Sequence, residues 1–213
     1  VELFPENKLG YYNYGNFLLE QKKLSEAELF NRKAIELDSS YASAYSNLGK
    51  ALLDQGKSQE AEIILYKAVE LNPTSSRNFS NLGASLLNQG KFKTSEEFLR
   101  KAIELDAKNV ISYINLGKIH VQNSELKEAE ILFRKAIQIN PKIGVAHLNL
   151  GAVLNELGKI NESEIFTREA IKINPFDSDA FVNLGQLYEQ KGKRDEARKF
   201  FLKALEVNPS SLL

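Results

Sequence analysis

The chain contains no cysteine, methionine or tryptophan among its 213 residues, and only five prolines. Without cysteine it can form no disulfide, use no thiol nucleophile and bind no metal through thiolates. Its 28 basic and 28 acidic residues give a formal net charge of zero, so bulk charge attracts neither nucleic acid nor anionic lipid. No apolar run approaches the roughly 20 residues of a membrane span. We therefore expect no metal, cofactor, nucleic acid or membrane span, and a soluble protein. The compartment stays unknown, with the cytoplasm favoured.

What the chain does contain is a repeat with a period of 34 residues. A tripeptide Asn-Leu-Gly, once Asn-Tyr-Gly, recurs six times without any insertion, and its glycines are Gly15, Gly49, Gly83, Gly117, Gly151 and Gly185. Alanine or serine follows twelve residues after each glycine, and alanine follows again after seven more. Three small residues in each repeat predict helices whose backbones approach closely.

Each repeat also carries two apolar stripes at helical spacing. In the second repeat the first stripe includes Leu48 and Leu52, the second runs from Ala61 to Val69, and Gly56 lies between them. This pattern predicts two helices of about 14 residues joined by a glycine turn. Lys22 and Ser124 replace the turn glycine in two repeats, so we expect these turns to be slightly strained or differently closed. Ser25 before Glu26 is typical of a capped start to the second helix.

The period and its Leu-Gly, Ala and Pro positions resemble the tetratricopeptide repeat family. The resemblance implies an all-α fold, a right-handed superhelical solenoid of antiparallel helix pairs forming one continuous domain. With glycine at position 8, residues 1–7 are the tail of a truncated preceding repeat, and the repeats are 8–41, 42–75, 76–109, 110–143, 144–177 and 178–213.

The strongest functional signal is an asparagine at position 6 of every repeat. These residues are Asn13, Asn47, Asn81, Asn115, Asn149 and Asn183. The resemblance places this position on the concave face, where a side-chain amide can pair with both N–H and C=O groups of an extended peptide. The ladder is similar to that of the O-GlcNAc transferase repeat region. Alternatively, each asparagine bonds locally to the adjacent helix and orders the stack.

Other residues of the expected concave face suggest how a bound peptide is selected. The basic candidates are Lys50, Arg77 and Lys118, and the apolar candidates are Ile111, Ile114, Val145 and Leu148. A groove that binds main chain and has an apolar centre fits an extended peptide. The sequence therefore predicts a protein-interaction scaffold with a protein or peptide ligand.

No catalytic arrangement can be assembled from this sequence. The two histidines, His120 and His147, fall at positions where the family packs aromatic residues, so we expect them in the core. We expect no enzyme activity from the chain itself. Two alternatives to the scaffold stay open: the chain is the recognition arm of a larger glycosyl- or sulfotransferase-type enzyme, or it forms homo-oligomers through its uncapped last helix.

Overall fold

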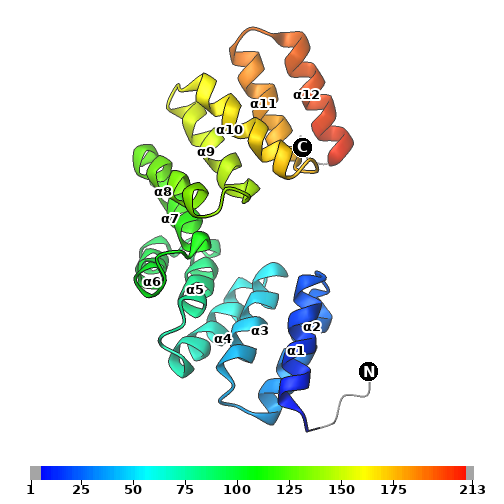
Figure 1. Ribbon diagram of the computed structural model, residues 1–213, viewed down its shortest axis with the longest axis vertical. Helices are drawn as coiled ribbons and strands as arrows, with labels where there is room; N and C mark the ends of the chain where they lie inside the picture. Colours follow the sequence, from blue (N-terminus) through cyan, green and yellow to red (C-terminus); the bar gives the residue numbers. More distant parts are fainter. Residues whose placement is uncertain (1–5, 210–213) are drawn as a thin grey trace. The chain divides into compact units, whose positions relative to one another are not determined.

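The structure, a computed structural model, describes residues 6–209 and consists of antiparallel helix pairs (Figure 1). Most of the expected tail of a preceding repeat, residues 1–7, lies outside the described residues. The first helices of the six pairs are α1 (Lys8–Glu20), α3 (Ala42–Asp54), α5 (Ser76–Asn88), α7 (Val110–Gln122), α9 (Gly144–Glu156) and α11 (Ser178–Gln190). The second helices are α2 (Leu24–Leu37), α4 (Ser58–Leu71), α6 (Phe92–Leu105), α8 (Leu126–Ile139), α10 (Ile160–Ile173) and α12 (Arg194–Val207).

The predicted all-α fold of six helix pairs is confirmed for the described residues. In each of the six described pairs, the first helix has 13 residues and the second helix has 14. None of the helices within residues 6–209 is long and apolar enough to cross a membrane. The chain divides into two compact units, Val1–Asn115 and Leu116–Leu213, and each is described by itself.

The repeated glycines allow the two helices of a pair to pack closely, as predicted. In the first unit, a Cβ atom added to Gly83 of α5 would lie 2.6 Å from Cγ of Leu99 in α6. In the second unit, a Cβ added to Gly185 would lie 2.4 Å from Cε1 of Phe201. Atoms cannot approach so closely, so only glycine fits at these positions without moving the facing side chain.

The turns inside the pairs show the predicted strain. Gly56 has a φ of 78°, in the left-handed region that glycine adopts freely. Lys22 and Ser124 take the same conformation, with φ of 58° and 62°, although their side chains disfavour it. The predicted cap at Ser25 is wrong. Helix α2 already begins at Leu24, so Ser25 lies inside its first turn, and Lys23 at the cap position makes no side-chain hydrogen bond.

A glutamate on the second helix of several repeats is held by cations from its own repeat and the next one. In the first unit, Glu28 accepts hydrogen bonds from Arg32 at 2.8 Å, from Gln55 at 2.9 Å and from Lys57 at 3.0 Å. Burial raises the pKa of Glu28, but the hydrogen bonds from Arg32, Gln55 and Lys57 outweigh it and lower the pKa to about 2. Glu62 is held in the same way by Lys91 at 2.7 Å.

The second unit repeats this arrangement, which we call the glutamate clasp. Glu164 of α10 accepts hydrogen bonds from Arg168 at 2.9 Å and from Lys191 of the following repeat at 2.5 Å. Burial raises the pKa of Glu164, while hydrogen bonds from Lys191, Arg168 and Tyr188 lower it to about 2. Glu130 is paired with Lys159 at 2.8 Å. The clasp therefore joins one repeat to the next by charge as well as by packing.

Candidate functional site

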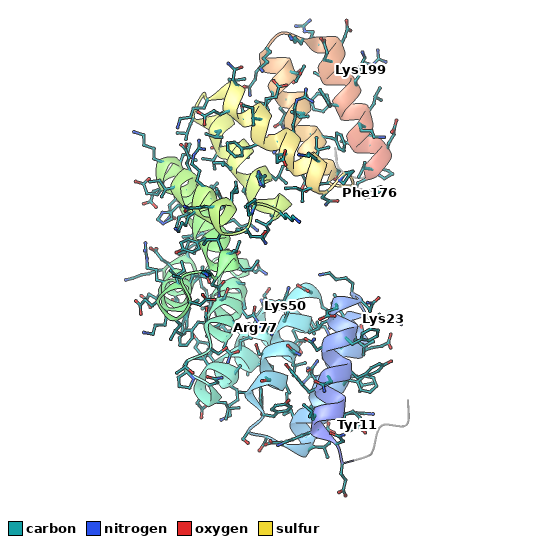
Figure 2. The ribbon with its side chains drawn as sticks, in the orientation of Figure 1. Tyr11, Lys23, Lys50, Arg77, Phe176 and Lys199 are labelled. Atoms are coloured by element: carbon teal, nitrogen blue, oxygen red, sulfur yellow. The ribbon has the colours of Figure 1, made fainter. Side chains whose placement is uncertain are left out.

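The first unit contains a groove of about 540 Å³ lined mainly by its first helices, α1, α3 and α5. Its asparagines include Asn47 and Asn81, its cations include Lys50 and Arg77, and Ile111 contributes an apolar wall. Lys50 and Arg77, labelled in Figure 2, come from α3 and α5. The remaining lining residues are Asn16, Leu19, Glu20, Lys22, Leu53, Asp54, Ser76, Ser80, Ala84, Asp106 and Asn109.

The asparagine amides of this groove are little used by the protein itself. Asn47 is 4% exposed, and its Nδ2 donates one hydrogen bond of 3.3 Å to Oδ1 of Asn16. This leaves a second N–H and the carbonyl oxygen of Asn47 without a partner among residues 6–209. Asn81 is half-buried and makes no side-chain hydrogen bond within that part of the chain. Asn13 of the first repeat is exposed and does not line the groove.

The groove holds charges of both signs, and most of them are paired. Asp54 is shared by Lys50, which bonds it directly, and by Lys22 at 3.6 Å. Glu20 accepts a hydrogen bond from Asn16 at 3.2 Å. Arg77 is exposed, and no carboxylate of residues 6–209 forms an ion pair with it. Its guanidinium is therefore free to bind an acidic group that enters the groove.

The expected apolar residues near the fourth repeat differ in their accessibility. Ile111 is 48% exposed and lines the groove beside Leu19 and Leu53. Ile114 is 3% exposed and offers little surface to a ligand, whereas Asn115 is 8% exposed, slightly more than Asn47. Neighbouring positions of the same helix, α7, thus differ widely in their exposure.

A second, smaller groove of about 290 Å³ lies in the other unit, between α9 and α11. Leu148 and Asn149 line it together with Ala152, and α11 contributes Asp179, Val182 and Asn183. Nδ2 of Asn149 is buried and has no hydrogen-bond partner among the described residues, 6–209. Val145, 39% exposed, and Lys118, also exposed, do not line this groove.

Both histidines lie in structural positions, as expected. His147 is buried, and its Nε2 lies 2.9 Å from the carbonyl oxygen of Pro141. Nδ1 of His120 lies 2.5 Å from Oε2 of Glu125. This contact spans the turn that follows α7, the helix that carries His120. Within residues 6–209, no group of three histidine, cysteine, aspartate or glutamate side chains is placed so that it could hold a metal ion.

Sequence reasoning missed several groove residues that come from other positions of the repeat. Asn109 lies just before α7, and its Nδ2 donates to Oγ of Ser76 at 2.7 Å. Asn16 holds Asn47 in place. The contact between Asn16 and Asn47 joins adjacent repeats, and the contact between Asn109 and Ser76 joins the two ends of one repeat. The residues involved do not recur at every period, so only the packing of the helices could have revealed them.

Comparison with protein families gives matches to repeat models along most of the chain. Models described as "Tetratricopeptide repeat" match residues 42–75, 81–142, 145–177 and 178–211. A model described as "TPR repeat" matches residues 15–56. The search of curated proteins gives no match to this sequence.

Several solved structures share the fold. A chain of the APC/C hetero-tetramer Cut9-Hcn1 matches with a TM-score of 0.93 and 18% identity over 100% of this chain, which spans 42% of that chain's length. PilF of Pseudomonas aeruginosa matches with a TM-score of 0.80 and 20% identity over 96% of this chain and 93% of its own. YrrB, described as a TPR protein with an unusual peptide-binding site, has a TM-score of 0.61 and 24% identity over 85% of this chain and 94% of its own.

Proposed function

This chain belongs to the tetratricopeptide-repeat family, and from that premise we propose that it is a scaffold that binds an extended segment of another protein through its asparagine ladder. The family matches point to a non-catalytic repeat protein whose role is protein–protein interaction. Stacked repeats bury each helix pair against its neighbours and leave one concave surface free for a ligand. YrrB, which shares the fold, offers a precedent, since its own description includes a peptide-binding site.

The observation that carries the proposal is the unused hydrogen-bonding capacity of the ladder asparagines. A local structural role would require each amide to be bonded to a neighbouring helix. Asn81 has no partner within residues 6–209, and Asn47 bonds only Asn16 there, which leaves its carbonyl oxygen and one N–H unpaired. A buried amide without a partner costs about 1–3 kcal/mol, and an extended main chain can supply both its donor and its acceptor. Such a contact is independent of the ligand's side chains.

Side chains around the larger groove give the proposed ligand its preferred sequence. Ile111, Leu19 and Leu53 offer apolar surface, which favours aliphatic residues in the bound segment. Arg77 has no carboxylate partner, so it favours an aspartate or glutamate nearby. Lys50 is already paired with Asp54 and contributes less. The ligand is therefore an extended segment with apolar residues beside an acidic one.

A peptide selection with matched variants tests this proposal. The chain is used to select peptides from a random display library, and selected peptides are then titrated against the Asn47→Ala/Asn81→Ala variant. Loss of two or more net hydrogen bonds at about 0.5–1.5 kcal/mol each should weaken binding by roughly 10- to 100-fold. The control is Asn161→Ala, an exposed asparagine of α10 outside both grooves.

Two further readouts decide what a change in binding means. The double variant should keep the helical signal and melting midpoint of the parent chain, because its amides make few bonds within the protein. If it unfolds instead, the ladder orders the stack and the proposal is wrong. Arg77→Ala should remove the preference for an acidic residue among selected peptides while main-chain binding persists.

A further inference from the structure

A further hollow of the first unit, which we call the hydroxyl pocket, lies where α3 and α5 begin. Its volume is about 210 Å³. Four hydroxyl groups and one cation line it, from Tyr12, Ser43, Ser46, Ser75 and Arg77, and two asparagines and an alanine complete the lining. No aspartate or glutamate of the described chain lines it. Arg77 also lines the larger groove, so the two hollows adjoin.

Two helix starts bring unused main-chain donors to this pocket. Ser43 and Arg77 are the second residues of α3 and α5, and their N–H groups make no hydrogen bond within residues 6–209. Tyr41, at the cap position of α3, makes no side-chain cap hydrogen bond. The start of a helix carries partial positive charge and favours an anion. Every repeat has helix starts, so the side chains must distinguish this pocket from the others.

The first distinguishing side chain is Ser46, whose hydroxyl group the fold does not use. Ser46 is 4% exposed, and its Oγ has no hydrogen-bond partner within residues 6–209. One period later, Oγ of Ser80 donates to Oδ1 of Asn109 at 3.4 Å. Around Ser46 the position of Asn109 is held by Ser75, whose Oγ accepts from the N–H of Asn78 at 3.3 Å instead. A buried hydroxyl without a partner is unfavourable, and a ligand in the pocket can relieve it.

The second distinguishing side chain is Arg77, which supplies a full positive charge (Figure 2). Its guanidinium is exposed and forms no ion pair within residues 6–209. One period later, Asn72 and Arg77 are replaced by Asp106 and Ile111, so the corresponding place in the next repeat gains an acid and loses the cation. The combination of two helix starts, a buried hydroxyl and an unpaired cation is therefore specific to this place rather than a feature of the period.

We propose that the hydroxyl pocket binds the phosphoryl group of a phosphorylated serine or threonine in the segment that the ladder holds, an inference that rests on the proposed function. A phosphoryl group carries a charge of about −1.5 to −2 at neutral pH and three acceptor oxygens. The two free N–H groups, the guanidinium of Arg77 and the hydroxyl of Ser46 together supply donors for all three oxygens. An aspartate or glutamate has less charge and one oxygen fewer, so it leaves more of these donors unpaired.

Selected peptides carrying phosphoserine, glutamate or serine, placed in turn at each position, provide the test by isothermal titration. At one position phosphoserine should bind the native chain roughly 10-fold or more tightly than glutamate. Arg77→Gln and Ser46→Ala should each reduce this preference while their melting midpoints stay at the native value, since neither side chain is bonded within residues 6–209. The matched control is Arg100→Gln, which removes the same charge from an exposed arginine of α6 outside both hollows and should leave the preference intact.

Failure of this inference and failure of the proposed function give different results. If peptides bind and depend on Asn47 and Asn81, but phosphoserine gains nothing at any position or its gain survives Arg77→Gln, the pocket inference is overturned and the ladder stands. If no peptide is selected, the ladder proposal fails, and inorganic phosphate still tests the pocket by nuclear magnetic resonance. The amide signals of Ser43 and Arg77 should then move with added phosphate and stay in place with chloride at equal ionic strength. Signals that phosphate leaves unmoved would overturn the inference.

Discussion

The contact between Gly83 and Leu99 predicts a mutation whose effect changes sign with its background. In Gly83→Ala, the new Cβ would lie 2.6 Å from Cγ of Leu99, and Leu99 is fully buried, so it cannot swing into solvent. Overpacking of this kind costs about 1–3 kcal/mol, whereas alanine in place of glycine gains roughly 1 kcal/mol of helix propensity. We expect a net loss of about 0–2 kcal/mol of unfolding free energy.

The Leu99→Ala background removes the obstructing side chain. That change alone should cost about 2–5 kcal/mol, because it leaves a cavity in a fully buried site. Adding Gly83→Ala there should be stabilising by roughly 1 kcal/mol, since the methyl group then meets the carbonyl oxygen of Ser95 at 3.4 Å, an ordinary contact, and the gain in helix propensity remains. The coupling between the two sites is then about 1–3 kcal/mol, which is the overpacking cost itself.

Urea unfolding followed by circular dichroism measures all four proteins of this cycle. Gly90→Ala serves as the control, because Gly90 has a φ of 72° and a Cβ added there would meet no atom within 4 Å. Its cost therefore arises from the backbone alone and should not depend on residue 99. If Gly83→Ala costs the same in both backgrounds, Leu99 does not make glycine necessary and the packing account is refuted.

Three further predictions concern single sites. Thr167→Val should stabilise the chain by about 1 kcal/mol in urea unfolding, because Oγ1 of Thr167 is buried without a partner; a loss would contradict this. Ser124→Gly should stabilise the chain by about 0.5–1 kcal/mol and Gly158→Ala should destabilise it, because both positions have positive φ. Thermal unfolding in which Ser124→Gly lowers the melting midpoint and Gly158→Ala raises it would disprove backbone strain at these turns. The folded pKa of Glu164 is about 2, below the unfolded value of 4.5, so its stabilisation is present above pH 4.5 and is lost as pH falls towards 2; Glu164→Gln should flatten this part of the stability–pH curve, and an unchanged slope would argue against the clasp.

The regular features of the fold could be predicted from sequence because they recur with the period. The presence of α3 and α4, the close packing at Gly83 and the strained turn at Ser124 all follow from residue type at a fixed register. The start of α2 could not be predicted as well. Ser25 is a good cap in isolation, but the helix begins at Leu24 and encloses it.

The candidate site could be predicted only in part. The period singles out Asn47 and Asn81, and both residues line one groove. It cannot tell that Asn13 is exposed outside the groove or that Ile114 is buried, because burial depends on the particular neighbours of each repeat. The glutamate clasp was also beyond sequence reasoning, since Glu28 and Lys57 meet only when one repeat is stacked on the next.

The central claim is that the ladder binds the main chain of an extended segment, and backbone methylation of a selected peptide tests it most directly. N-methylation removes one main-chain N–H donor at a time while every side chain stays in place. Isothermal titration should show at least one or two positions at which methylation weakens binding roughly 10-fold or more in the native chain but has little further effect in Asn47→Ala/Asn81→Ala. If methylation leaves affinity unchanged at every position while side-chain substitutions abolish it, the ligand is recognised by its side chains and the account is wrong.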